Sequence, residues 1–197
     1  MNRWFFVVIS ALTPLVRILC PIRITGKENI PEGGALICSN HTSAVDIVHL
    51  AVALGPRTNF AVMAKDSLFK NKLIGWFFGK MGAFPVNRGG SDLVAMKTAL
   101  KALQDGKKLV IFPEGTRVEK QGEASAKGGV ALLATRTGVP IVPVYCGVRQ
   151  KFFRWNPVTF GKAYVPQIAG RRATPEENQQ IADQLLENIY ALKEHQA

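Results

Sequence analysis

The sequence predicts an α/β fold: a single domain with a largely parallel sheet and helices on both faces. Short apolar runs, each of about four to eight residues, alternate along the chain with stretches whose apolar residues recur at helical spacing. Buried parallel strands separated by amphipathic helices produce this alternation. The chain has 197 residues, 47% of them hydrophobic, which is enough for one domain with a substantial core and makes disorder improbable.

The first half of the chain supplies three expected strands. Gly33 and Gly34 precede a strand at residues 35–38, and Thr42 or Ser43 is expected to cap a helix that ends near Leu54. A strand at residues 60–63, a helix at 67–80 and a strand at 83–86 complete this half. The order of these elements is that of a parallel sheet with helical connections.

The second half continues the pattern. Ser91 or Asp92 is expected to cap a helix that ends at Gly106, and Thr174 with Glu177 forms a capping-box signature at the start of a final helix. Strands are expected at residues 109–112, 139–146 and 158–165, and a helix at 129–137. Pro140 and Pro143 predict that the strand at 139–146 lies at a sheet edge or is irregular, because proline cannot donate to a strand ladder.

Residues 1–25 are expected to form a membrane-associating segment. Residues 4–16 are apolar and lie between Arg3 and Arg17, but a membrane-spanning helix needs roughly 20 apolar residues. A helix in the plane of the membrane interface is favoured; a buried core helix and a secretory signal peptide are the alternatives. Pro14 should kink this helix or split it in two. The residues expected to reach the headgroups or insert are Trp4, Phe5, Phe6, Val7, Ile9, Leu12, Leu15, Val16 and Ile18.

The net charge indicates the kind of binding partner, and the cysteine content bears on disulfides and metal sites. Lys and Arg number 25 against 14 acidic residues, a formal charge of +11. This excess favours anionic partners, namely nucleic acid, acidic lipid headgroups or phosphorylated substrates. The three cysteines, Cys20, Cys38 and Cys146, are too scattered for a disulfide framework or a zinc site. No metal site is expected.

A histidine and an aspartate follow the first expected strand. On one continuous helix, His41 and Asp46 would diverge by roughly 140°, so they can meet only if His41 lies on the turn and Asp46 inside the helix. A carboxylate on one imidazole nitrogen leaves the other nitrogen free to take a proton. Helix capping is the simpler interpretation of the pair alone. Backbone amides at residues 42–44 are candidate oxyanion donors.

Two further polar clusters also follow expected strands. Arg88 precedes two glycines, an arrangement that suits a phosphate because a guanidinium matches its oxygens. Glu114 to Arg117 join a carboxylate, a glycine and a second arginine, and Lys127 precedes an expected helix start, another place that attracts anions. Taken singly, the Arg88 cluster is more simply a solvated turn, and the cluster at residues 114–117 is open to interpretation as a surface turn with an ion pair.

Together the clusters resemble the four sequence blocks of the glycerolipid acyltransferase family, which includes the 1-acyl-sn-glycerol-3-phosphate acyltransferases. Asn40, His41 and Asp46 match its N-H-x-x-x-x-D block. The second block, a lysine followed later by G-x-x-x-x-x-R, is matched by Lys65, Gly82 and Arg88. Residues 112–117 match F-P-E-G-T-R and residues 139–144 match V-P-I-V-P-V. The resemblance extends over about residues 30–150 and makes residues 26–197 an acyltransferase domain.

The resemblance implies transfer of an acyl group from acyl-CoA or acyl carrier protein to lysophosphatidic acid, which gives phosphatidic acid in phospholipid synthesis. It implies His41 as general base and Asp46 as its partner. The residues expected to bind the acceptor are Arg88, Arg117, Lys65, Lys127, Glu114, Gly115 and Thr116. No cofactor is expected, and the protein should be peripheral or monotopic on the cytoplasmic face of a membrane.

Two alternatives remain open from the sequence. One is an acyltransferase or transacylase that uses another glycerolipid acceptor. The other is a non-enzymatic basic protein that binds membranes. A nucleic-acid partner is not expected, since the sequence contains no nucleic-acid reader motif.

Overall fold

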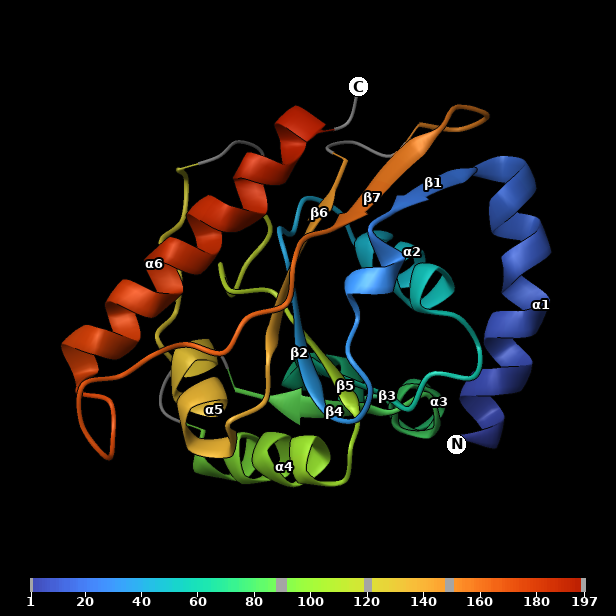
Figure 1. The fold of residues 1–197 in the computed structure, drawn as a ribbon. Coiled ribbons are helices and arrows are strands. Elements are labelled where there is room, and N and C mark those ends of the chain that lie inside the picture. The colour runs from blue at the N-terminus through green and yellow to red at the C-terminus, as the bar shows by residue number, and fades with distance from the viewer. Residues whose placement is uncertain (1, 88–91, 119–121, 148–150, 196–197) are drawn as a thin grey trace.

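The strands form a sheet whose two edges are made by β1 and β4. The computed structural model describes residues 2–87, 92–118, 122–147 and 151–195, and within them the sheet has seven strands in the order β1-β7-β6-β2-β5-β3-β4 (Figure 1). The strands are β1 (Ile22–Thr25), β2 (Ala35–Ser39), β3 (Phe60–Lys65), β4 (Ala83–Val86), β5 (Lys108–Ile111), β6 (Ile141–Cys146) and β7 (Asn156–Phe160). Strands β6 to β4 are parallel, whereas β7 is antiparallel to β6 and parallel to β1. The predicted largely parallel sheet is confirmed.

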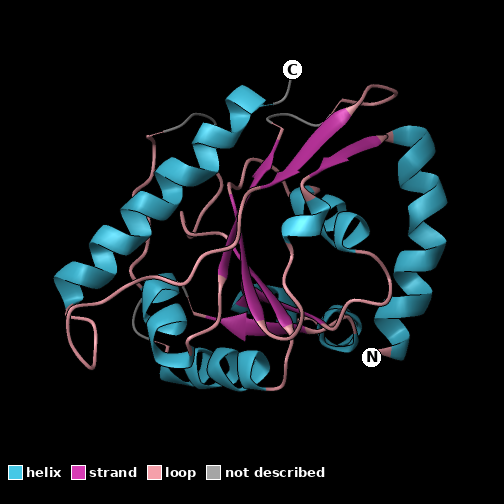
Figure 2. Ribbon diagram, viewed as in Figure 1, coloured by secondary structure: helices cyan, strands magenta, loops and turns pink. Residues whose placement is uncertain are grey.

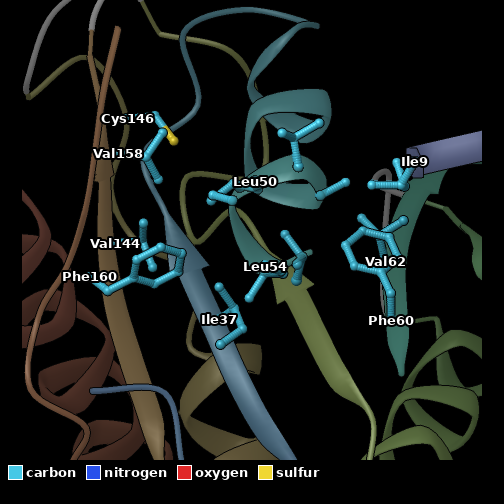
Figure 3. Close-up of a cluster of buried hydrophobic side chains, with 14 of the residues drawn as sticks. Ile9, Ile37, Leu50, Leu54, Phe60, Val62, Val144, Cys146, Val158 and Phe160 are labelled. Atoms are coloured by element: carbon cyan, nitrogen blue, oxygen red, sulfur yellow. The ribbon is translucent and has the colours of Figure 1, made fainter. Parts of the chain in front are cut away.

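Helices cover both faces of the sheet (Figure 2). The helices are α1 (Arg3–Leu19), α2 (Asp46–Leu54), α3 (Lys72–Lys80), α4 (Leu93–Gln104), α5 (Gly129–Thr137) and α6 (Pro175–Ala191). Buried residues of α1 and α2 belong to the core on one face, and those of α4, α5 and α6 to the core on the other. In the first core, Leu50 and Leu54 of α2 point toward Ile37 of β2 and Val144 of β6 (Figure 3).

Local sequence signals account for most helix boundaries. The predicted capping box at Thr174 and Glu177 is formed, and Asp92 caps α4 by accepting from the Ala95 N–H. The helix expected at residues 67–80 is instead a 3-10 turn at Asp66–Phe69 followed by α3, because the Asn71 side chain caps a new start. Strand β1 was not predicted, and β7 is shorter than expected.

The strand with the prolines is not at an edge, which corrects the sequence prediction. β6 lies between β2 and β7. Pro143 occupies the ladder position beside Gly161, just after the end of β7, and its carbonyl still accepts from the Gly161 N–H at 2.8 Å. A β-carbon at Gly161 would lie 2.9 Å from the Pro143 ring. An interior proline is therefore tolerated because it faces a strand end and a residue without a side chain.

Helix α1 is continuous through Pro14, so the expected split is wrong. Phe5, Ile9 and Val16 are buried against the main core on both sides of the proline, and this packing holds the two halves in one helix. These three residues were expected to lie in the membrane, which the structure also corrects. A second apolar stripe remains exposed and consists of Trp4, Val7, Leu15 and Ile18. No helix among the described residues has the length and apolar character needed to cross a membrane.

Candidate active site

The predicted site residues that the structure describes gather at one edge of the sheet. Strands β2, β5, β3 and β6 are parallel, so their carboxyl ends meet where ligands bind in open α/β sheets. His41 follows β2, Glu114 follows β5, and Lys65 ends β3. Arg88 lies outside the described residues. The topology thus places the first and third clusters on neighbouring strands.

His41 and Asp46 form a buried pair. The His41 Nδ1 atom lies 3.1 Å from Asp46 Oδ2, and the Asp46 side chain is fully buried. The same oxygen accepts from the N–H groups of Thr42 at 2.7 Å and Ser43 at 2.8 Å. The turn and the helix start are therefore fixed around a single carboxylate oxygen.

This arrangement corrects two expectations about residues 42–44. Helix α2 begins at Asp46 with Val45 at the N-cap position, and neither Thr42 nor Ser43 caps it with a side chain. The N–H groups of Thr42 and Ser43, two of the three expected oxyanion donors, are bonded to Asp46 and are not available for that role. The Ser43 hydroxyl instead accepts from the Val45 N–H at 3.2 Å, within the turn that precedes the helix.

The pair defines the chemistry available to His41. With Nδ1 held by Asp46, Nε2 is the nitrogen left to exchange a proton. The carboxylate stabilises the imidazolium that forms when Nε2 takes that proton. The ring of His41 also stacks on Phe112, with centroids 4.0 Å apart and planes inclined by 19°. His41 is thus held in one orientation by a hydrogen bond and a ring contact.

Asn40 fixes the chain just before His41. Its side chain is fully buried and makes two bonds to the end of β6: Nδ2 donates to the Cys146 carbonyl at 2.9 Å, and Oδ1 accepts from the Cys146 N–H at 2.8 Å. Strands β2 and β6 are thereby joined beyond their last ladder pair. The backbone at the start of the His41 turn is therefore held in place by these two bonds.

Glu114 is buried beside the same turn. Its Oε2 accepts from the His41 N–H at 2.8 Å, and its Oε1 accepts from the hydroxyl of Tyr190 on α6 at 2.6 Å. Burial raises the pKa of Glu114, and the bonds from Tyr190 and from the His41 amide oppose part of that rise. These contacts make Glu114 a support for the His41 backbone in this structure.

The loop after β5 is bonded to the His41 turn through its backbone and carries exposed cationic residues. Gly115 adopts a left-handed conformation with φ of +67°, and its N–H closes a turn on the Phe112 carbonyl. Thr116 and Arg117 are exposed, and the next residue, Val118, donates its N–H to the His41 carbonyl at 2.9 Å.

Two lysines lie near this loop. Lys127 is exposed, and its N–H donates to the Pro113 carbonyl at 2.8 Å. Lys65 is exposed at the end of β3, with β5 between that strand and β2.

A cavity of about 340 Å³ opens beside this loop. Phe112, whose ring stacks on His41, forms part of its wall. Gly115, Lys127 and Asn87 also line it, and apolar side chains make much of the rest, among them Met63, Met96, Ile111, Val130 and Leu133. The cavity therefore combines an apolar interior with polar groups next to the His41 turn.

Sequence reasoning missed Tyr190. It lies 76 residues from Glu114, and a tyrosine within an amphipathic helix has no local signal that distinguishes it from a packing residue. His49, one helical turn after Asp46, was expected to be packed or exposed rather than catalytic. It is packed: only 1% of it is exposed.

Comparison with known proteins gives one consistent result. The acyltransferase family model matches residues 21–147. The 1-acyl-sn-glycerol-3-phosphate acyltransferase of Bacillus subtilis is 35% identical over 135 residues, which cover 68% of this chain and 66% of that protein. The enzyme of that name from Borreliella burgdorferi is 33% identical, over 68% of this chain and 54% of that protein.

A related enzyme and a solved structure extend the comparison. The lyso-ornithine lipid O-acyltransferase of Pseudomonas aeruginosa is 30% identical over 76% of this chain and 54% of that protein. The chain therefore spans less than two thirds of the length of these curated relatives. The crystal structure of the 1-acyl-sn-glycerophosphate acyltransferase of Thermotoga maritima superposes with a TM-score of 0.70 at 22% identity, over 96% of this chain and 78% of that one. This last similarity establishes the fold.

Proposed function

Because the chain belongs to the acyltransferase family, we propose that it transfers a fatty acyl group from a thioester to the free hydroxyl of 1-acyl-glycerol-3-phosphate. The product is phosphatidic acid, and the donor is acyl-CoA or acyl-acyl carrier protein. The single observation that carries the proposal is the buried His41–Asp46 pair at the carboxyl edge of the sheet. The names of the relatives from Bacillus subtilis and Borreliella burgdorferi support the choice of acceptor.

The proposed reaction is a direct transfer. The acceptor oxygen attacks the thioester carbonyl carbon while Nε2 of His41 takes the hydroxyl proton. Collapse of the tetrahedral intermediate breaks the carbon–sulfur bond, and His41 returns the proton to the departing thiolate. Asp46 stabilises the imidazolium between these steps, and general-base help of this kind contributes about 10²–10⁴-fold.

The acceptor phosphate is assigned to the cations around the His41 turn. Arg117 is exposed immediately before a residue bonded to His41, and we assign it and Arg88 to the phosphate oxygens. Lys127 and Lys65 add weaker attraction. Gly115 has a left-handed conformation and no side chain, which leaves space for the phosphate beside Lys127. The Thr116 hydroxyl can donate a hydrogen bond to the phosphate. Glu114 acts by holding the His41 backbone.

The cavity beside Phe112 is assigned to the donor's acyl chain. An alkyl chain gains free energy on leaving water at roughly 25 cal/mol per Å² of buried surface. The apolar walls supply that environment, and the ring of Phe112 separates them from His41. The thioester would then lie near the polar rim, within reach of the base.

The substrates also assign a location. Both lipids reside in a bilayer, so residues 1–25 are proposed as the membrane-associating segment and residues 26–197 as the catalytic domain. The protein would be peripheral or monotopic on the cytoplasmic face. The exposed stripe of α1, which contains Trp4 and Ile18, is the part of that segment free to enter the interface.

The test is a substrate panel. Purified protein is incubated with acyl-CoA or acyl-acyl carrier protein and, in turn, with lysophosphatidate, glycerol 3-phosphate, other lysophospholipids and lyso-ornithine lipid, and products are identified by mass. Phosphatidic acid should form fastest, and His41→Ala should remove it. A faster reaction with another acceptor would reassign the substrate, and absence of transfer from any thioester would refute the proposal.

A further inference from the structure

Residues 151–155 form a short loop between β6 and β7, here called the aromatic loop. Its sequence is Lys-Phe-Phe-Arg-Trp. Phe152, Phe153 and Trp155 are 69%, 71% and 70% exposed. Three large rings displayed to water within four residues carry an unfavourable hydration free energy in the isolated protein, and such clusters mark interaction sites. The loop lies outside the family model and outside the catalytic machinery.

The backbone of the aromatic loop is held from inside. The buried Asn156 side chain accepts from the Lys151 N–H at 2.7 Å and donates to the carbonyls of Lys151 at 3.0 Å and Arg154 at 2.9 Å. Phe153 has a φ of 57°, a left-handed conformation that is unfavourable for a bulky side chain. The rings therefore face outward on an ordered loop, which lowers the entropy lost on binding.

The same contacts join the aromatic loop to the end of α1. The Phe153 N–H donates to the Leu19 carbonyl at 2.7 Å, and the Asn156 N–H donates to the Pro21 carbonyl at 2.8 Å. The loop and the C-terminal end of α1 lie side by side at the upper right of Figure 1. The last turns of α1 expose Leu15 and Ile18, so apolar side chains continue from the helix to the loop.

We propose that the aromatic loop and the exposed stripe of α1 form one docking surface for an anionic bilayer. Aromatic rings are favoured at the membrane interface. Lys151 and Arg154 are interspersed among those rings, and Arg17 lies in the last turn of α1. Cations beside interfacial rings are attracted to acidic headgroups. This surface deepens the membrane association proposed above and rests on it.

Docking through the aromatic loop would also place the His41–Asp46 pair close to the membrane. The loop follows β6, and the end of β6 is bonded through Cys146 to Asn40, the neighbour of His41. The aromatic loop and the catalytic pair therefore share one edge of the sheet. Contact through α1 alone would leave this edge free to tilt away from the bilayer, whereas a second contact through the loop would hold it close to the membrane.

The first experiment compares two polar variants. The loop variant carries Phe152→Ser, Phe153→Asn and Trp155→Ser, with Asn chosen because it tolerates a positive φ. The control carries Leu93→Ser and Val94→Ser, two residues of α4 that are 72% and 75% exposed. The loop variant should lose about tenfold or more in partition onto phosphatidylglycerol-containing vesicles, equivalent to about 1.4 kcal/mol. The control should bind like the unmodified protein, and equal losses in both would overturn the proposal.

A matched activity measurement separates this inference from the proposed function. With a short-chain lysophosphatidate dissolved as monomers, the loop variant should turn over at the unmodified rate. With vesicle-borne acceptor its rate should fall in step with vesicle binding. Undiminished activity on vesicles would refute the docking surface but leave the proposed reaction intact, and no turnover by the unmodified protein on either acceptor would refute the reaction alone.

The second experiment locates the loop in the bilayer. Trp4→Phe with Trp76→Phe leaves Trp155 as the single tryptophan, because the chain has three. Its fluorescence should shift to the blue and be quenched by brominated lipids in anionic vesicles, and Lys151→Gln with Arg154→Gln should weaken both effects. A water-like Trp155 on bound vesicles contradicts the proposal. So does a response to single-stranded oligonucleotide but not to vesicles, which would indicate a nucleic-acid surface.

Discussion

Replacing Tyr190 with phenylalanine tests whether α6 positions the catalytic turn. The change removes one hydroxyl, which donates to Glu114 Oε1 at 2.6 Å, and leaves the ring. Hydrogen bonds to charged groups contribute about 1.5–3 kcal/mol. A kilocalorie shifts the Tm of a chain of this size by about 2–4 °C, so a fall of roughly 3–12 °C is expected.

The loss of stability caused by Tyr190→Phe should increase as the pH rises. The folded-state pKa of Glu114 is raised by burial, so between its unfolded and folded pKa values the folded protein binds more protons and stability falls as pH rises. Tyr190 stabilises the ionised carboxylate, and removing its hydroxyl raises the folded pKa further. The destabilisation by Tyr190→Phe should therefore be larger at pH 8 than at pH 5, as measured by thermal unfolding at both.

The catalytic readout distinguishes positioning from simple packing. Glu114 holds the His41 N–H, so a looser Glu114 should lower kcat by about tenfold, less than the roughly hundredfold that an ångström of misplacement costs, and leave KM nearly unchanged. Asn178→Ala, elsewhere on α6, supplies a control for general destabilisation of that helix. If Tyr190→Phe keeps full kcat and shows the same Tm loss at both pH values, the positioning role is wrong.

Three other outcomes follow from the same geometry. His41→Ala should fold normally and keep less than a tenth of the turnover; a higher rate would mean that another group is the base. Arg117→Ala and Arg88→Ala should each raise the acceptor KM by about tenfold or more with little change for the donor, and equal effects on both substrates would indicate a structural role. Ile9→Ala should cost about 2–5 kcal/mol of stability, measured by denaturant unfolding, whereas Val7→Ala should leave stability unchanged and weaken vesicle binding; the reverse result would mean that α1 packs by its other face.

Much of the fold was predictable because its signals are local. The cap of α6 at Thr174 and the buried run of β5 each depend on residues within one turn or one strand. The position of β6 was not predictable from Pro143, because the tolerance for that proline depends on Gly161. The burial of Phe5 and Ile9 was equally hidden, since an apolar helix does not show which face meets the core.

In the site, too, the residues with local sequence signals were predicted and those that act through long-range contacts were not. The residues of the first and third clusters were found because each follows a strand, and parallel strands bring their ends together. Their supports were not found, because each comes from a distant part of the chain: Cys146 holds Asn40, and Tyr190 holds Glu114. The predicted caps at Thr42 and Ser43 were wrong because α2 begins only at Asp46, after a turn in which the Asp46 carboxylate accepts from both amides.

The spacing of His41 and Asp46 shows how these levels combine. Five residues on a helix would separate the two side chains by roughly 140°, and they meet only because α2 begins at Asp46 and the turn before it curls back onto that carboxylate. The curl alone would leave the turn free to move. Two distant contacts hold it, the Asn40 bonds to β6 on one side and the Glu114 bond to the His41 amide on the other. The local sequence therefore sets which groups can react, and the long-range pairs set how accurately they are held.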